Sequence, residues 1–175
     1  MTRIFLLGFM GTGKTTLGRA LALNMGLSFC DLDQYIEQRY MKSVSRIFSE
    51  SGQDEFRRIE ARLLREVGEF EDVVISCGGS TPLFFDNMDY MNSCGTTVWV
   101  DSSVPALYRR LKIARQARPL IASMDDDQLL AYIRAELARR EPYYRKAGYH
   151  YSGDHLESVG QIAESVAGLR ELLQI

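Results

Sequence analysis

Short runs of apolar residues alternate along this 175-residue chain with longer segments in which apolar residues recur every three or four positions. The short runs are typical of strands buried on both faces, and the longer spacing is typical of helices with one apolar face. This alternation predicts an α/β fold, in which helices cover both faces of a parallel sheet and ligands bind beyond the carboxyl ends of the strands. The expected strands are residues 4–7, 28–30, 73–76, 96–100 and 149–151, and the expected helices are residues 13–25, 34–40, 45–48, 54–67, 104–115, 127–140 and 157–173.

The composition narrows the class of protein. Hydrophobic residues make up 46% and charged residues 25%, which is ordinary for a globular domain and excludes disordered and low-complexity classes. No repeat or linker divides the chain, so we expect a single domain over residues 1–175. Three widely spaced cysteines without a C-x-x-C pair, and no secretory pattern, predict reduced thiols in the cytoplasm and no zinc site.

Charge indicates what kind of ligand the chain handles. The net charge of −2 gives no reason to expect nucleic acid or a membrane surface as a partner, and no apolar run approaches the ~20 residues of a membrane span. Among the 21 basic residues, however, 17 are arginine. Arginine binds carboxylates and phosphates through a planar fork of donors, so this surplus favours small anions as ligands.

Residues 8–15, GFMGTGKT, match the phosphate-binding pattern G-x-x-x-x-G-K-[ST] between an expected strand and an expected helix. Glycines allow successive backbone N–H groups to face one anion, and the helix adds the positive end of its dipole. Lys14 is expected to contact the β- and γ-phosphates, and the Thr15 hydroxyl suits Mg²⁺. The strand and helix on either side argue against a chance glycine-rich turn.

Asp31 and Asp33 follow the short second strand and should lie on the same side of the chain, with Leu32 opposite. At the carboxyl end of a strand, one carboxylate can hold Mg²⁺ through water while the other accepts a hydrogen bond from an attacking hydroxyl. The alternative is that Asp33 only caps a helix beginning at Gln34.

An apolar stripe along residues 56–67 places Arg57 on its flank and Arg58 away from it. Arg57 is therefore expected to lean into a cleft, while Arg58 is expected to be solvated. Glu60 falls inside the stripe, where an unpaired carboxylate would be costly, so it is expected to pair with the Arg57 guanidinium. The alternative for Arg57 is an ordinary surface ion pair with Glu60.

Three later segments complete the set of candidates. Gly78 and Gly79 follow the end of a strand and allow a ligand to approach the backbone closely, although a plain turn would also use two glycines. Cys77, just before them, has only apolar neighbours and is expected to be packed rather than nucleophilic. Arg118, before a proline, lies in a basic segment that either closes over a nucleotide or is a solvated loop. Pro142 is expected to break the helix just after Arg140.

Taken together, these motifs resemble those of the shikimate kinase family. The segments that carry the resemblance occur in family order: residues 8–15, Asp31-Leu32-Asp33, Phe56-Arg57-Arg58-Ile59-Glu60, Cys77-Gly78-Gly79-Ser80, Arg118-Pro119-Leu120 and Arg140-Glu141-Pro142-Tyr143-Tyr144. The resemblance implies a P-loop NTPase-like three-layer α/β/α fold with a five-stranded sheet of order 2-3-1-4-5. It implies transfer of the ATP γ-phosphoryl group to the 3-hydroxyl of shikimate, a step of chorismate and aromatic amino-acid biosynthesis, by a usually monomeric enzyme with Mg²⁺.

The resemblance also implies a role for each site residue. Lys14, Asp33 and Arg118 would be catalytic, and Asp33, Arg57, Gly79 and Arg140 would bind shikimate. ATP would contact Gly11, Thr12, Gly13, Lys14, Thr15, Thr16, Arg110 and Arg118, and Mg²⁺ would lie on Thr15 and, through water, near Asp31. Residues 32–62 would form the substrate-binding helical region and residues 112–124 a lid. One departure is Ser80, where the family usually has a third glycine; a positive φ there would strain a serine.

Other functions remain open from the residues alone. The nearest alternative is another small-molecule P-loop kinase such as a gluconate kinase, since gluconate also carries a carboxylate. A nucleotide-switched regulator would need a guanine-reading N-K-x-D segment, which the chain lacks. An ATPase module would use the Asp101 carboxylate, at the end of an apolar strand, to bind its metal ion. No glutamate follows Asp101 to activate water.

Overall fold

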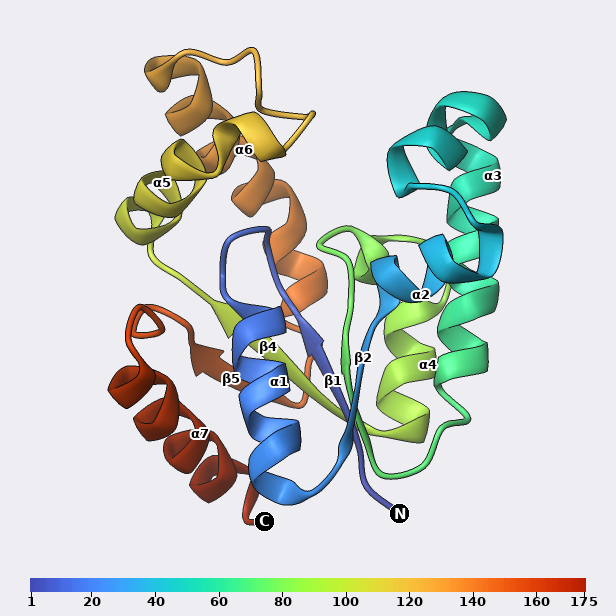
Figure 1. Ribbon diagram of the computed structural model, residues 1–175, viewed down its shortest axis with the longest axis vertical. Coiled ribbons are helices and arrows are strands. Elements are labelled where there is room, and N and C mark those ends of the chain that lie inside the picture. Colours follow the sequence, from blue (N-terminus) through green and yellow to red (C-terminus); the bar gives the residue numbers. More distant parts are fainter.

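Five parallel strands form one sheet at the centre of the protein, in a computed structural model that describes residues 1–175 (Figure 1). Their order across the sheet is β2-β3-β1-β4-β5, as the family resemblance implied. All neighbouring pairs are parallel, and the five strands predicted from apolar runs are confirmed to within a residue at either end. The strands are β1 (Arg3–Leu7), β2 (Ser28–Asp31), β3 (Val73–Ser76), β4 (Thr96–Asp101) and β5 (Tyr149–Ser152).

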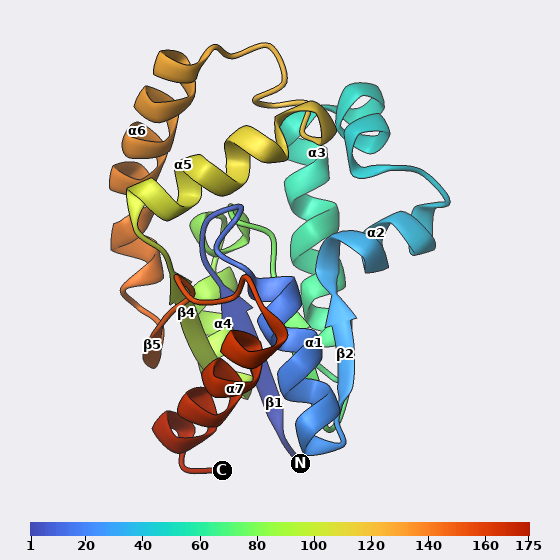
Figure 2. The same ribbon diagram turned by 60° about the vertical axis from the view of Figure 1, so that its left-hand side comes forward.

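Helices cover both faces of this sheet, and strand alternation sorts the core into two clusters. In β1, Phe5 and Leu7 join a cluster beneath α2 to α6, while Ile4 and Leu6 point to the opposite face. Figure 2 shows α1 and α7 packed side by side over that opposite face. The helices are α1 (Lys14–Met25), α2 (Leu32–Tyr40), α3 (Val44–Val67), α4 (Asn87–Cys94), α5 (Val104–Ile113), α6 (Asp126–Tyr144) and α7 (Val159–Leu173), with short 3₁₀ turns η1 (Thr81–Leu83) and η2 (Arg115–Ala117).

The α3 helix joins two helices that the sequence predicts separately. Its path is broken at Gly52, whose φ of 79° and ψ of 171° are not helical. A positive φ is readily adopted only by glycine, so the kink is fixed at this residue. The second half of α3 carries Arg57 and Glu60 towards the sheet.

Two predictions about helix ends are wrong. The α2 helix begins at Leu32, and Asp31 rather than Asp33 is its N-cap, with the Asp31 carboxylate accepting a bond of 3.3 Å from the Gln34 N–H. Pro142 does not end α6 after Arg140, because the helix continues to Tyr144. Proline's own φ is helical and it removes only one hydrogen bond, which costs little in a final turn.

None of the helices combines the length and the apolar character that crossing a bilayer requires.

Candidate active site

A cleft of about 490 Å³ opens at the carboxyl ends of β1, β2 and β3. This is the edge at which ligands of open α/β sheets bind. Most of the predicted site residues line it: Gly11, Gly13, Lys14, Thr15, Thr16, Asp31, Asp33, Gly79, Arg110 and Arg118. Three predicted residues, Thr12, Arg57 and Arg140, are not among the residues that line it.

The loop between β1 and α1 has the backbone that an anion cradle needs. Gly8, Gly11 and Gly13 have φ values of 142°, 83° and 90°. At Gly8 a side chain is also excluded by space, because its Cβ would lie 2.2 Å from the Val100 carbonyl oxygen. Thr12 turns inward, where its hydroxyl donates to the Phe9 carbonyl at 2.9 Å, so this side chain shapes the loop instead of facing the cleft.

Lys14 is buried at the start of α1. Its Nζ donates to the carbonyl oxygens of Gly8 at 2.8 Å and Phe9 at 2.9 Å. Burial lowers the Lys14 pKa to about 8, and the nearby Asp33 carboxyl opposes this shift. The ammonium group therefore lies inside the loop, next to the backbone on which phosphates would rest.

Three oxygen donors meet at the rim of the loop. The Thr15 hydroxyl donates to Asp31 Oδ2 at 3.0 Å and lies 3.5 Å from Ser76 Oγ. No group of three or more His, Cys, Asp or Glu side chains has a geometry that could hold a metal ion by itself. One carboxylate with hydroxyl oxygens fits Mg²⁺, which keeps most of its waters and is completed by substrate phosphates. Ser76 was missed by sequence reasoning, although its place at the end of β3 could have indicated it.

Asp33, in the first turn of α2, is the carboxyl group of the cleft whose pKa is raised. Burial raises its pKa to about 6, and the neighbouring Glu60 and Asp31 carboxylates add to the shift. Asp31 is the extended N-cap of α2 and Asp33 lies in its first turn, so the two do not alternate along one strand, yet both line the cleft. A carboxyl group with a pKa near 6 is well suited to accept a proton at neutral pH.

Arg58 is exposed, as predicted, and Arg57 is largely buried. Arg57 was expected to lean into the cleft, but it does not line it, because its guanidinium is turned to Glu60. Arg57 Nη1 donates to Glu60 Oε2 at 2.9 Å, and Glu60 Oε1 accepts from the Thr81 hydroxyl at 2.7 Å. The guanidinium also lies over the Phe84 ring, 4.3 Å from its centroid. The predicted pairing with Glu60 is confirmed as a buried one, so the surface ion-pair alternative is wrong.

Gly79 and Arg140 meet beside the phosphate loop, although α6 comes much later in the chain. A Cβ on Gly79 would lie 3.1 Å from Arg140 Nη1 and 3.3 Å from the Gly8 carbonyl oxygen. Glycine is therefore needed at this position for close approach. Ser80 has a φ of −102°, which any residue adopts, so replacing the family's glycine there causes no backbone strain.

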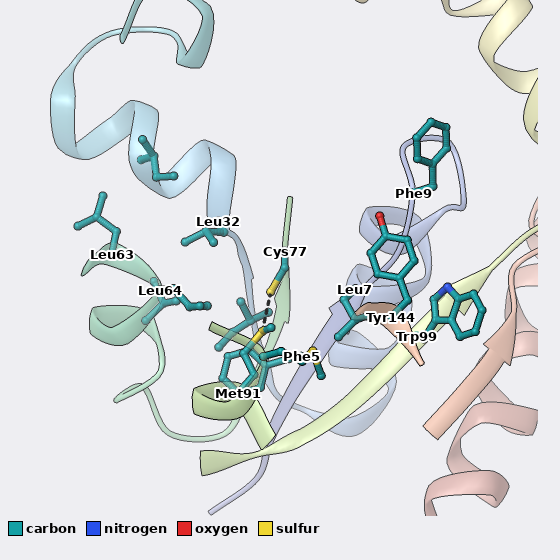
Figure 3. Packing of buried hydrophobic residues seen from close by; sticks show 14 of the residues in the cluster. Phe5, Leu7, Phe9, Leu32, Leu63, Leu64, Cys77, Met91, Trp99 and Tyr144 are labelled. Atoms are coloured by element: carbon teal, nitrogen blue, oxygen red, sulfur yellow. Dashed lines mark hydrogen bonds between the residues drawn. The ribbon is translucent and has the colours of Figure 1, made fainter. Parts of the chain in front are cut away.

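Cys77 is a packed residue, as expected. Its side chain is buried, and the thiol lies 3.6 Å from the Met91 sulfur (Figure 3). Burial raises the pKa of this thiol well above its usual range. It is therefore not an activated nucleophile.

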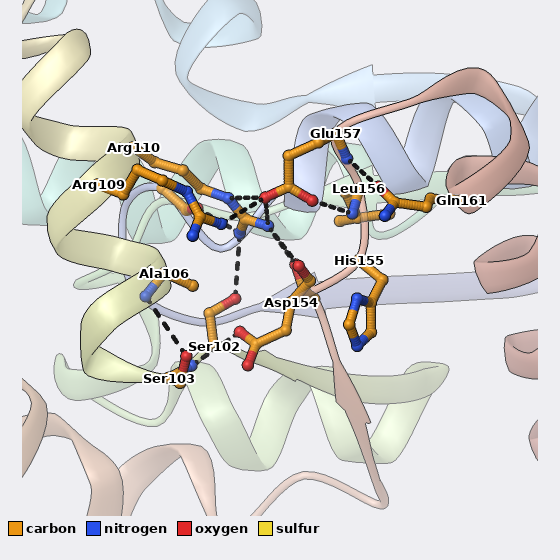
Figure 4. A network of polar contacts seen from close by, with 12 residues as sticks. Ser102, Ser103, Ala106, Arg109, Arg110, Asp154, His155, Leu156, Glu157 and Gln161 are labelled. Atoms are coloured by element: carbon orange, nitrogen blue, oxygen red, sulfur yellow. Dashed lines mark hydrogen bonds and ion pairs between the residues drawn. The ribbon is translucent and has the colours of Figure 1, made fainter.

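Arg110 joins three parts of the chain at the other end of the cleft (Figure 4). Its guanidinium donates to the Gly11 carbonyl at 3.1 Å, the Gly153 carbonyl at 2.8 Å and Glu157 at 2.7 Å. Arg110 holds the pKa of Glu157 at about 2. Glu157 also lines the cleft and was missed, because no motif surrounds it in the sequence.

Arg118 reaches the cleft from the connection between α5 and α6, which includes η2. It is half-buried, and burial lowers its pKa. The two ends of this connection are held together by Arg115, which donates to the Met124 carbonyl at 2.8 Å and pairs with Asp126.

Asp101 does not face the cleft. It pairs with His150 across β4 and β5, at 3.3 Å. The strand-ending aspartate therefore does not supply the metal carboxylate that an ATPase module would need.

Comparisons with known proteins agree on one family. A family model described as shikimate kinase matches residues 10–169. The chain is 53% identical to the shikimate kinase of Phocaeicola vulgatus over 99% of both chains. A 1.7 Å crystal structure of shikimate kinase from Bacteroides thetaiotaomicron superimposes with a TM-score of 0.97 at 48% identity over 99% of both chains. Shikimate kinase from Acinetobacter baumannii in complex with shikimate gives 0.84 at 28% identity over 99% of this chain and 94% of that one.

Proposed function

The chain belongs to the shikimate kinase family and is an ATP-dependent kinase that phosphorylates an alcohol group of shikimate; on this premise we propose a role for each residue of the cleft. The substrate complex of the Acinetobacter baumannii relative supports shikimate as the acceptor here. The acceptor hydroxyl is the 3-hydroxyl, and gluconate is not a substrate.

The phosphate groups of ATP bind on the loop from Gly11 to Thr16. The left-handed backbone at Gly11 and Gly13 and the N-terminus of α1 support this assignment. Lys14 neutralises the charge that develops on the γ-phosphoryl group, and Arg118 does so from the lid. Arg110 flanks the adenine, and Glu157 holds the Arg110 guanidinium in place.

The Thr15 hydroxyl and, through water, Asp31 hold Mg²⁺. Their oxygens are hard donors, already 3.0 Å apart at the rim of the loop. Bound there with the phosphates, the ion supplies further neutralisation of the transferring group.

Arg57 and Arg140 bind the shikimate carboxylate, and the Gly79 N–H donates to the same molecule. Two guanidiniums on one carboxylate fix the ring, so that the acceptor hydroxyl points along the line of phosphoryl transfer. Asp33 accepts the hydroxyl proton as the hydroxyl oxygen bonds to the γ-phosphorus, while the bond from the γ-phosphorus to the β–γ bridging oxygen breaks and ADP leaves. Closure of residues 112–124 excludes water, which would otherwise compete as acceptor.

The enzyme acts as a monomer, as the family resemblance implies. It acts in the cytoplasm, a compartment that keeps its three free cysteines reduced.

One observation carries this proposal: the phosphate loop faces a buried carboxyl group of raised pKa, with Arg140 packed against the glycine loop beside it. An acceptor panel tests it. ADP release at fixed ATP and Mg²⁺ is measured with shikimate, with gluconate and with no acceptor, for the wild type and for Lys14→Ala. Release that depends on shikimate and is lost in Lys14→Ala is the expected result. Equal release without acceptor, or release with gluconate, contradicts the proposal.

A further inference from the structure

The Arg140 guanidinium is buried with a single carboxylate partner, Glu136, one turn earlier on α6. Glu136 Oε2 accepts from Arg140 Nε at 2.9 Å and from Arg140 Nη2 at 2.6 Å. The carboxylate therefore occupies one edge of the guanidinium and leaves Nη1 directed elsewhere. Nη1 lies against Gly79, where a Cβ would be 3.1 Å away.

We infer that Glu136 is a positioning residue for the acceptor: it fixes the Arg140 fork so that its remaining edge faces the carboxylate of shikimate. This inference rests on the proposed role of Arg140. The donors of a guanidinium lie in one plane. Holding the Nε and Nη2 edge of Arg140 therefore also fixes the direction in which its remaining edge, with Nη1, points.

Two neighbouring side chains, Arg139 and Phe9, help to hold Glu136 and Arg140 in place. Arg139 donates to the same carboxylate from the solvent side, at 2.7 Å, and fixes Glu136 from behind. The Arg139 and Arg140 guanidiniums hold the pKa of Glu136 below its usual range, so that the carboxylate is ionised at neutral pH. On its other side, the Arg140 guanidinium lies 5.0 Å from the centroid of the Phe9 ring in the phosphate loop. Arg140 is thus held between its own helix and the loop that binds ATP.

Glu136 has two opposing effects on shikimate binding. Its negative charge repels the shikimate carboxylate from the Arg140 guanidinium, while its hydrogen bonds hold that guanidinium in place. The side chain of Arg140 is only 7% exposed, whereas that of Glu136 is 19% exposed and partly screened by water. Loss of positioning therefore outweighs loss of repulsion.

The test compares Glu136→Gln with Glu141→Gln, which removes a carboxylate from an exposed pair with Arg145 on the same helix. Glu136→Gln is expected to raise the KM for shikimate roughly tenfold while the KM for ATP and the melting temperature stay near wild type. Glu141→Gln is expected to change neither KM. An unchanged or lowered KM for shikimate in Glu136→Gln overturns the inference.

A double-mutant cycle separates this inference from the proposed clamp. In an Arg140→Ala background, Glu136→Gln is expected to add nothing to the KM for shikimate, because it acts through the missing guanidinium. Full additivity would mean that Glu136 does not act through Arg140. If Arg140→Ala itself leaves this KM unchanged, the clamp fails, and the inference fails with it. An effect of Arg140→Ala without one of Glu136→Gln rejects the inference alone.

Discussion

At the scale of single residues, Asp33 links the chemistry of the site to its energetics. Burial, together with two neighbouring carboxylates, raises its pKa to about 6. An acid with a raised pKa is neutral, and so unable to accept a proton, at any pH below that value. The same shift has consequences for turnover and for stability.

For turnover, the pH profile of kcat/KM for shikimate is expected to fall below about pH 6 and to reach a plateau above it. The loss should approach tenfold for each pH unit below the pKa, because only the ionised carboxylate acts as a base. Initial rates between pH 5 and 8, with ATP and Mg²⁺ saturating, measure it. A flat profile, or a rate that rises as the pH falls, would remove Asp33 from the role of base.

For stability, Asp33→Asn is expected to inactivate the enzyme but to raise its free energy of unfolding at pH 7.5. In the folded state the Asp33 pKa is about 6 against 3.8 for a free side chain, so ionisation costs folding roughly 3 kcal/mol at most. This cost appears as the pH rises through the window from about 4 to 6 and is constant above it. The stability difference between variant and wild type should therefore be smaller at pH 5 than at pH 7.5, as urea unfolding would measure. A variant less stable than the wild type at pH 7.5 would refute the argument.

At the scale of elements, periodic patterns were enough to predict the strands and most of the helices. The strands β1, β3 and β4 contain uninterrupted apolar runs, and α5 and α7 have clear apolar faces. The α4 helix was missed because it is short and buries only two apolar side chains, Met88 and Met91. The path of α3 depends on Gly52, and no local pattern shows that one glycine joins two helices at an angle.

The kink in α3 positions Arg57, so Gly52→Ala should affect both stability and acceptor binding. The φ of 79° with a ψ of 171° lies in a region essentially restricted to glycine and costs a residue with a Cβ about 1–3 kcal/mol, although no atom lies within 4 Å of the new Cβ. We expect a lower melting temperature and a KM for shikimate raised about threefold or more. Gly26→Ala is the matched control, since Gly26 has a φ of 67° and open space but caps α1 away from the cleft.

Thermal unfolding and steady-state kinetics of both variants make this comparison. Gly26→Ala should lose a similar amount of stability with both KM values unchanged. If Gly52→Ala loses stability but binds shikimate normally, the kink does not position Arg57.

At the scale of the whole molecule, the motifs predicted most of the residues that line the cleft but not how they are held. The phosphate loop, Asp33 and Arg57 carry local sequence patterns that indicate their chemistry on their own. Glu157 lies in loop sequence without a motif and meets Arg110 only after folding. Glu136 is one turn from Arg140 on α6, but this spacing alone does not show that the pair is shielded from solvent. The raised pKa of Asp33 likewise depends on Glu60, which α3 brings from another part of the chain.

The most direct test of the account is the steady-state kinetics of Arg57→Ala and Arg140→Ala, because these two guanidiniums are proposed to bind the same shikimate carboxylate. Each lost charge-assisted contact is expected to raise the KM for shikimate roughly tenfold or more, while the KM for ATP stays within about twofold of wild type. If both variants keep a wild-type KM for shikimate, or lose ATP affinity instead, the assignment of an acid-binding pocket opposite the phosphate loop is contradicted.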